Sequence, residues 1–98
     1  MSASLPSDVA QALSPLLAQL AERGAEPTSY ESSASFGNFA VSFAANTREF
    51  MIARDRGQFI VSGPSRQELE SAGLWRAFVG VRELSTPLLA WVASESAA

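Results

Sequence analysis

The chain has 98 residues, of which 47% are hydrophobic and 17% charged, and its formal net charge is −3. This length and composition are typical of one folded domain rather than of a disordered segment. There is no cysteine and no histidine, and every basic residue is arginine. Disulfides, thiol nucleophiles, the usual proton shuttle near neutral pH and lysine Schiff bases are therefore excluded. We predict a protein that is not an enzyme and holds no cofactor or metal.

The acidic balance, with an isoelectric point near 4.8, argues against a nucleic-acid partner, because such a surface needs clustered positive charge. It is compatible with a basic protein partner. No apolar run approaches the ~18 residues that a membrane-spanning helix needs, so no membrane partner is expected. The first residues lack the basic and apolar pattern of an export signal, and we expect a cytoplasmic protein.

The first predicted element is helical and runs from Ser7 to Gly24. Pro15 interrupts it, so either the helix kinks there or Ser14 caps a fresh helix with Pro15 at its first position. Gly24 is a natural helix stop, and residues 24–27 are interpreted as a short connector. The apolar residues at helical spacing are Val9, Leu13, Leu16, Leu17 and Leu20.

Residues 28–63 predict four antiparallel strands in chain order. Large apolar and small residues alternate from residue 39 to residue 44, as in a half-buried strand. Gly37-Asn38 is a turn pair that closes a tight hairpin, because both residues tolerate positive φ. The resulting pairs are Phe36 with Phe39, Ala34 with Val41, and Ser32 with Phe43.

The second hairpin turns at Asn46-Thr47, or in a longer loop with the same pairing. Phe43 then faces Phe50 and Val41 faces Ile52, so the apolar face continues across the turn.

The third hairpin allows two registers. With Arg56-Gly57 as the tip, Phe59 faces Arg54 and Val61 faces Ile52. With residues 55–57 as a bulged loop, Ile60 faces Ile52 instead. The first register is preferred because it aligns Ala34, Val41, Ile52 and Val61 in one row.

The two faces of this sheet differ in character. The phenylalanine-rich face needs a cover, which the helices at both ends of the chain can supply. The opposite face is small and weakly polar, and is either solvated or covered by a partner or by a second copy of the chain. It carries Ser33, Ser35, Ala40, Ser42, Ala44, Glu49, Met51, Ala53, Gln58 and Ile60.

After the sheet, Gly63-Pro64 ends the last strand and residues 65–68 form a capping box that opens a helix. Residues 74–82 fit either a strand or a helix and are interpreted as helical. Thr86-Pro87 predicts the cap and first turn of a final helix. Trp75 and Trp91 are interpreted as core residues. This order of elements predicts an α+β fold: an N-terminal helix, a four-stranded antiparallel meander, and two or three C-terminal helices packed on one sheet face.

Arg48, Arg54, Asp55 and Arg56 are the candidate partner-binding residues, because guanidinium groups near turns can clamp a carboxylate or phosphate. Charged turn residues are also ordinary structural features. Arg54 faces the apolar side in the preferred register, so it must snorkel or pair with Glu31 or Glu83.

The segment FGNFAVSFAANTREFMIARDRGQFIVSG resembles a pattern in small bacterial proteins, some of which are similar to immunity proteins. The resemblance covers under a third of the chain and transfers no functional residue. The leading hypothesis is a non-catalytic protein-interaction module, and within that class an immunity or antitoxin protein that neutralises its partner. The alternative is an anion- or ligand-binding module or accessory subunit that uses Arg54 and Arg56.

Overall fold

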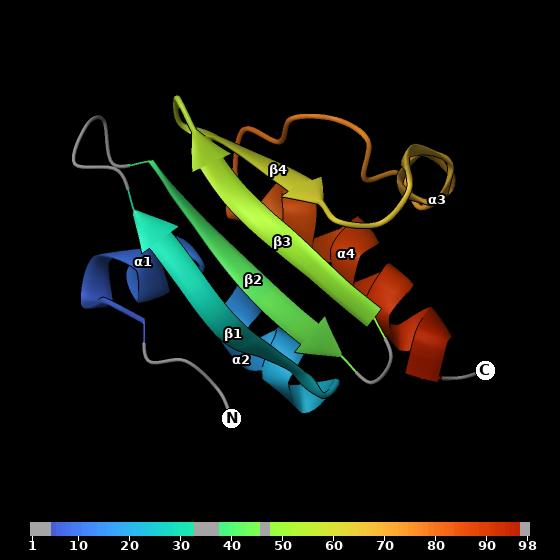
Figure 1. Cartoon of the computed structure of the whole chain (residues 1–98), viewed down its shortest axis with the longest axis horizontal. Helices are drawn as coiled ribbons and strands as arrows, with labels where there is room; N and C mark the ends of the chain where they lie inside the picture. Colours follow the sequence, from blue (N-terminus) through green and yellow to red (C-terminus); the bar gives the residue numbers. More distant parts are fainter. Residues whose placement is uncertain (1–4, 33–37, 46–47, 97–98) are drawn as a thin grey trace.

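The computed structural model describes residues 5–32, 38–45 and 48–96 and confirms the α+β class (Figure 1). A four-stranded antiparallel meander follows two short helices and precedes two more. In chain order the elements are α1 (Ser7–Ala12), α2 (Leu16–Glu22), β1 (Ala25–Ser32), β2 (Phe39–Ala45), β3 (Arg48–Asp55), β4 (Gln58–Ser62), α3 (Arg66–Ser71) and α4 (Val81–Ser96).

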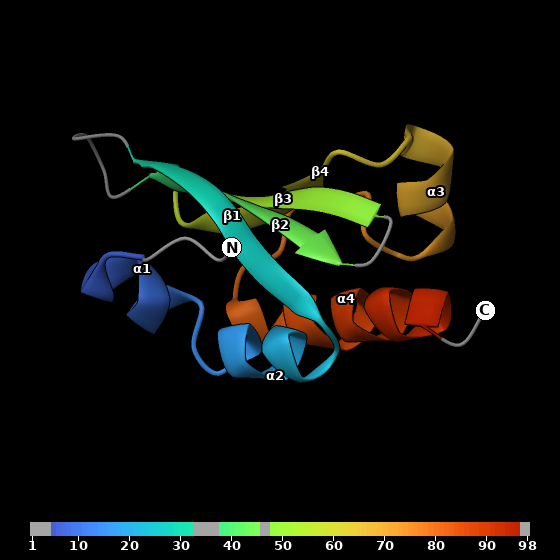
Figure 2. The same cartoon turned by 60° about the horizontal axis from the view of Figure 1, so that its bottom comes forward.

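The sheet has the strand order β1-β2-β3-β4. Helices α1, α2 and α4 lie on one of its faces, as Figures 1 and 2 show together, and α3 lies beyond the end of β4. The N-terminal helices and α4 therefore cover the same side of the meander. No helix of the described residues lies on the other side.

The core lies between the sheet and these helices. Alternate residues of β2, β3 and β4 are buried, which is the period-two pattern of a sheet with one covered face. The rings of Phe43 and Phe50 stack with centroids 5.1 Å apart, and Phe50 meets Trp91 of α4 edge to face at 5.6 Å. The other large side chains in the core include Leu13, Leu16, Leu20, Val41, Ile52, Leu69, Leu74, Phe78, Leu84 and Leu88.

The registers predicted for the second and third hairpins are confirmed. Phe43 pairs with Phe50 and Val41 with Ile52, while the tip at residues 46–47 lies outside the described residues. In the third hairpin, Phe59 pairs with Arg54 and Val61 with Ile52.

The tip of the third hairpin is Arg56-Gly57, with φ of 54° and 79°. Two successive positive φ values match the right-handed twist of the flanking strands.

The register predicted for the first hairpin is wrong. Phe39 pairs with Ser32 and Val41 with Tyr30, so β1 is displaced by four residues from the predicted pairing there. Phe43 pairs with Pro27, a displacement of five, because the register shifts between Pro27 and Ser29. Ala34, Phe36 and Gly37 lie outside the described residues. Because Phe39 pairs with Ser32 and not with Phe36, Asn38 is not part of a two-residue tip.

Two features accompany this displacement. Gly24, with φ of 82°, precedes β1 directly, so residues 25–27 of the predicted connector belong to the strand and Ala25 is buried opposite Ala45. The Asn38 side chain binds the neighbouring turn instead of its own hairpin: its Oδ1 accepts the Arg56 backbone N–H at 3.1 Å, and its Nδ2 donates to Asp55 at 3.4 Å.

Pro15 separates two helices, as one of the predicted alternatives required. However, Pro15 occupies the capping position before Leu16, and the N-terminus of α2 has no side-chain cap, so Ser14 is not the capping residue. Leu16 and Leu20 are buried, as their helical spacing predicts.

The helix predicted at residues 74–82 is wrong for residues 74–80, whereas Val81 and Arg82 belong to α4. Helix α3 ends at Ser71, Gly73 has φ of 76°, and residues 74–80 run without helix along the outer edge of β4. Phe78 and Phe59 exchange backbone hydrogen bonds of 2.8 Å in both directions. The outer edge of β4 has backbone N–H and C=O groups without a partner strand. An extended segment at Phe78 supplies the hydrogen bonds that the backbone of Phe59 needs.

The predicted start of the last helix at Thr86-Pro87 is also wrong, because α4 begins at Val81 and contains Pro87 in its interior. Leu84 and Leu88 are both fully buried one turn apart, on either side of the proline position. Their burial outweighs the loss of one helix hydrogen bond.

The opposite sides of β3 give a test of the fold. We expect Ile52→Ala to lower the free energy of unfolding by about 2–5 kcal/mol, since it leaves a cavity in the core. Met51→Ala, one residue away on the uncovered face, should cost about 1 kcal/mol or less. Urea unfolding followed by circular dichroism measures both values. Equal costs for the two variants would contradict the assignment of faces.

Candidate functional site

The candidate residues predicted from the sequence do not form one cluster. Arg48 begins β3, whereas Arg54, Asp55 and Arg56 lie at its far end. At ~3.3 Å per residue, the strand separates the two groups by roughly 20 Å.

Arg48 lies in a junction of three elements. Its guanidinium is 3.1 Å from Glu68 Oε2 and stacks 4.8 Å from the centroid of the Trp91 ring. The Trp91 Nε1–H donates to the same carboxylate oxygen at 2.9 Å. The predicted capping box is thus only half formed: Ser65 Oγ accepts the Glu68 backbone N–H, but the Glu68 side chain joins α4 to β3. These contacts give Arg48 a structural role.

Arg54 lies on the covered face, as its register predicts. Its guanidinium carbon is 6.0 Å from the Phe59 ring centroid, and its Nε is buried without a hydrogen-bond partner. Among the described residues, neither Glu31 nor Glu83 forms an ion pair with it. Arg54 therefore snorkels past the phenylalanine ring instead of pairing.

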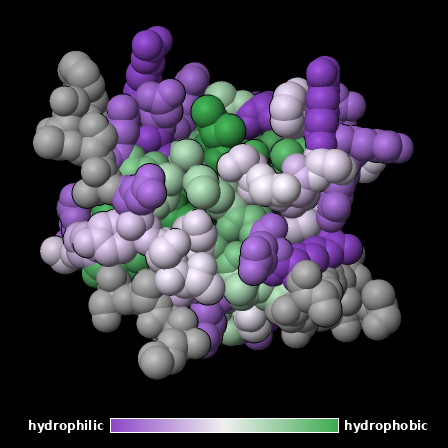
Figure 3. All heavy atoms as spheres, viewed as in Figure 1, coloured by the Kyte–Doolittle hydropathy of each residue, from purple (hydrophilic) through white to green (hydrophobic). Residues whose placement is uncertain are grey.

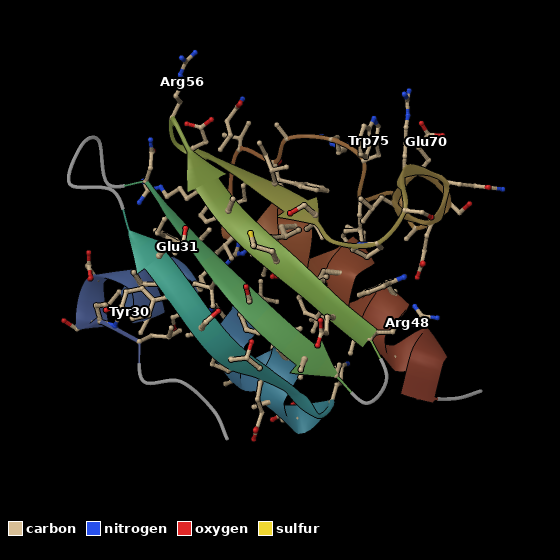
Figure 4. All side chains as sticks on the ribbon, viewed as in Figure 1. Tyr30, Glu31, Arg48, Arg56, Glu70 and Trp75 are labelled. Atoms are coloured by element: carbon tan, nitrogen blue, oxygen red, sulfur yellow. The ribbon has the colours of Figure 1, made fainter. Side chains whose placement is uncertain are left out.

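Arg56 and Asp55 are exposed at the β3–β4 turn, and Figure 4 shows Arg56 projecting away from the sheet. Asp55 and the Arg56 backbone are both held by Asn38. Because Arg54 lies against the core and Arg56 extends into solvent, the two guanidinium groups do not converge on one anion.

In the described part of the chain, one side of the sheet is not covered by a helix, and we call it the open sheet face. Its middle is small or apolar, and Figure 3 shows hydrophobic side chains running through it with hydrophilic ones mainly toward its margins. By strand alternation its members are Glu26, Ser29, Glu31, Ala40, Ser42, Ala44, Glu49, Met51, Ala53, Asp55, Gln58, Ile60 and Ser62.

The sequence prediction identified the β2 members of this face and most of those on β3 and β4, but it missed Asp55, Ser62 and the members on β1. It placed Ser33 and Ser35 here, which lie outside the described residues. The observed register instead brings Glu26 opposite Ala44 and Glu31 opposite Ala40. The face is therefore more acidic than the sequence indicated.

A hollow of about 400 Å³ opens on this face beside Met51. It is shaped by small residues: Ser42 lies in its floor, and Gly63 lies where a Cβ would be only 3.1 Å from Phe50 Cα. A side chain at residue 63 would meet the β3 backbone, and its φ of 112° also favours glycine. The hollow can accept a side chain from another molecule.

The margin at β4 adds a second apolar feature. Ile60 is 38% exposed and Trp75 is 50% exposed, so the prediction that Trp75 is a core residue is wrong, whereas Trp91 is buried. Both exposed residues line a cleft of about 180 Å³ with Val61, Leu74, Arg76 and Ala77. Half-exposed tryptophan is a common anchor at protein interfaces.

The described residues contain no group of three or more acidic side chains arranged to hold a metal ion. Within the same ranges, no helix is long and apolar enough to cross a membrane. Comparisons with family models, curated proteins and solved structures gave no match to this chain. The function must therefore be argued from the surface itself.

The buried Nε of Arg54 leads to a stability prediction. We expect Arg54→Met to raise the free energy of unfolding by about 1 kcal/mol, because it removes a desolvated donor that makes no hydrogen bond and keeps an apolar stem against Phe59. Arg56→Met, at the exposed tip, is the control and should change it by less than about 0.5 kcal/mol. Thermal and urea unfolding measure both. A clear loss of stability in Arg54→Met would mean that the guanidinium has a stabilising partner.

Proposed function

We propose that this chain is a non-catalytic protein-interaction module whose docking surface is the open sheet face. The observation that carries the proposal is the one-sided cover of the sheet. Helices shield one face, while the other presents Ala40, Ala44, Met51, Ala53 and Ile60. Small side chains let a partner approach the sheet closely, and Met51 and Ile60 supply apolar contact area.

The edges of the sheet are less suited to binding than its face. On β1, Pro27 lacks a backbone donor, and the register shifts between Pro27 and Ser29. On β4, Phe78 occupies the backbone groups of Phe59. Both features discourage the addition of a partner strand. Binding through the face is therefore favoured over strand addition.

Within this class, we propose that the chain neutralises its protein partner, as immunity proteins and antitoxins do. The small size, the acidic charge and the absence of cysteine, histidine and lysine support a role that needs contact and no chemistry. The resemblance of residues 36–63 to immunity-like proteins supports the same role.

A single charged side chain in the middle of the face tests the docking surface. We expect Ala53→Arg to abolish recovery of the specific partner from an extract of the producing cells, because the long cation blocks close approach to β3. Ala18→Arg adds the same side chain on the exposed surface of α2 and should leave recovery unchanged. Affinity capture with quantitative mass spectrometry measures both, and circular dichroism confirms that each variant is folded. Equal recovery by both variants would contradict the proposal.

A further inference from the structure

We infer that the open sheet face docks onto a basic protein surface, whose arginine or lysine side chains meet Glu26, Glu31 and Glu49. This inference rests on the proposed function and adds the chemistry of the partner. It follows from the position of the carboxylates in the sheet, from the absence of cations on the same face, and from the shape of the surface between them.

The register places two of the carboxylates in one cross-strand row. Glu26 of β1 pairs with Ala44 of β2, and Ala44 pairs with Glu49 of β3. The two glutamates therefore flank a small residue, with their backbones about 10 Å apart at two strand spacings. A cation held over Ala44 is within reach of both flexible carboxylates. Glu31 extends the negative charge to the row of Ala40 and Ala53.

No arginine of the described residues lies on the open sheet face to neutralise this charge. Arg48 is paired with Glu68, Arg54 lies on the covered face against Phe59, and Arg66 is paired with Glu70. The remaining four lie on α2 (Arg23), at the β3–β4 turn (Arg56), beside Phe78 (Arg76) and on α4 (Arg82). Neither Glu26 nor Glu49 takes part in an ion pair or side-chain hydrogen bond within the described residues.

A second copy of the chain does not fit this charge pattern. A symmetric dimer through the open sheet face would oppose the same patch on both subunits. Since that patch has carboxylates and no cation, docking would desolvate Glu26, Glu31 and Glu49 without compensation. A partner rich in arginine or lysine supplies the missing charges.

The shape of the face suits such a partner. The hollow beside Met51 is lined by Ser29, Ser42 and Ser62 and by Glu49 at its margin. The aliphatic stem of an arginine or lysine can lie in this hollow with its charged end toward the carboxylates. Apolar and electrostatic contacts would then come from the same side chain.

Peptides of opposite charge test the inference on the intact chain. An (Arg-Ala)₅ decapeptide should shift the amide NMR signals of Ser42, Ala44 and Met51, and an (Glu-Ala)₅ decapeptide should not. The double variant Glu26→Gln/Glu49→Gln should weaken binding of the basic peptide about fivefold, since it removes two exposed ion pairs. Glu22→Gln/Glu83→Gln makes the same change of net charge on exposed helical positions and should retain affinity within about twofold.

Equal loss of affinity in both double variants, or signal shifts spread over α2 and α4, would overturn the inference by showing that only net charge matters. Self-association that Ala53→Arg abolishes, measured by sedimentation, would instead assign the face to a second copy and would also overturn it.

Affinity capture of the partner distinguishes a failure of this inference from a failure of the proposed function. Loss of capture with Ala53→Arg but not with Glu26→Gln/Glu49→Gln would keep the docking surface and refute its charge chemistry. Unchanged capture with both would refute both proposals.

Discussion

The fold depends on covering one face of a four-stranded sheet. The apolar rows that cross β2, β3 and β4 are buried beneath α1, α2 and α4, and the aromatic contacts from Phe43 through Phe50 to Trp91 join the middle of the sheet to α4. Within the residues that the structure describes, the helices cover this face alone. The uncovered face is a direct consequence of how the core is built, because the same strands form both faces.

The fold class and two of the three hairpins could be predicted from the sequence because local chemistry and hydrophobic pattern agree there. Arg56-Gly57 accepts two positive φ values, and the register with this tip aligns Val41, Ile52 and Val61 in one apolar row. The first hairpin offered a misleading turn signal. Gly37-Asn38 fits a tight turn, but Asn38 hydrogen-bonds the adjacent β3–β4 turn, a tertiary contact that no local pattern reveals.

The candidate site was predicted only in part for the same reason. Most members from β2 to β4 follow from alternation, and Glu31 keeps its face when β1 shifts by four residues. Glu26 lies on this face only because the register shifts between Pro27 and Ser29. The segment of residues 74–80 was also missed, because its extended shape is set by the free edge of β4 and not by its own sequence. Trp75 is exposed as a result, beside Ile60. Edge pairing is non-local, so helix and strand patterns do not determine it.

The combination of small central residues and marginal carboxylates has a consequence for selectivity. An apolar sheet surface alone would adhere to many proteins, since burial of apolar area is not directional. Glu26 and Glu49 are exposed to water while the face is free. A partner that covers them without supplying cations removes their water and gives no ion pair in return, which costs binding free energy. Discrimination between partners then comes largely from rejection of the unsuitable ones. The displacement of β1 by four residues places Glu31 beside Ala40, and the further register shift between Pro27 and Ser29 places Glu26 beside Ala44. The edge register that completes the sheet therefore also sets which surfaces it can bind.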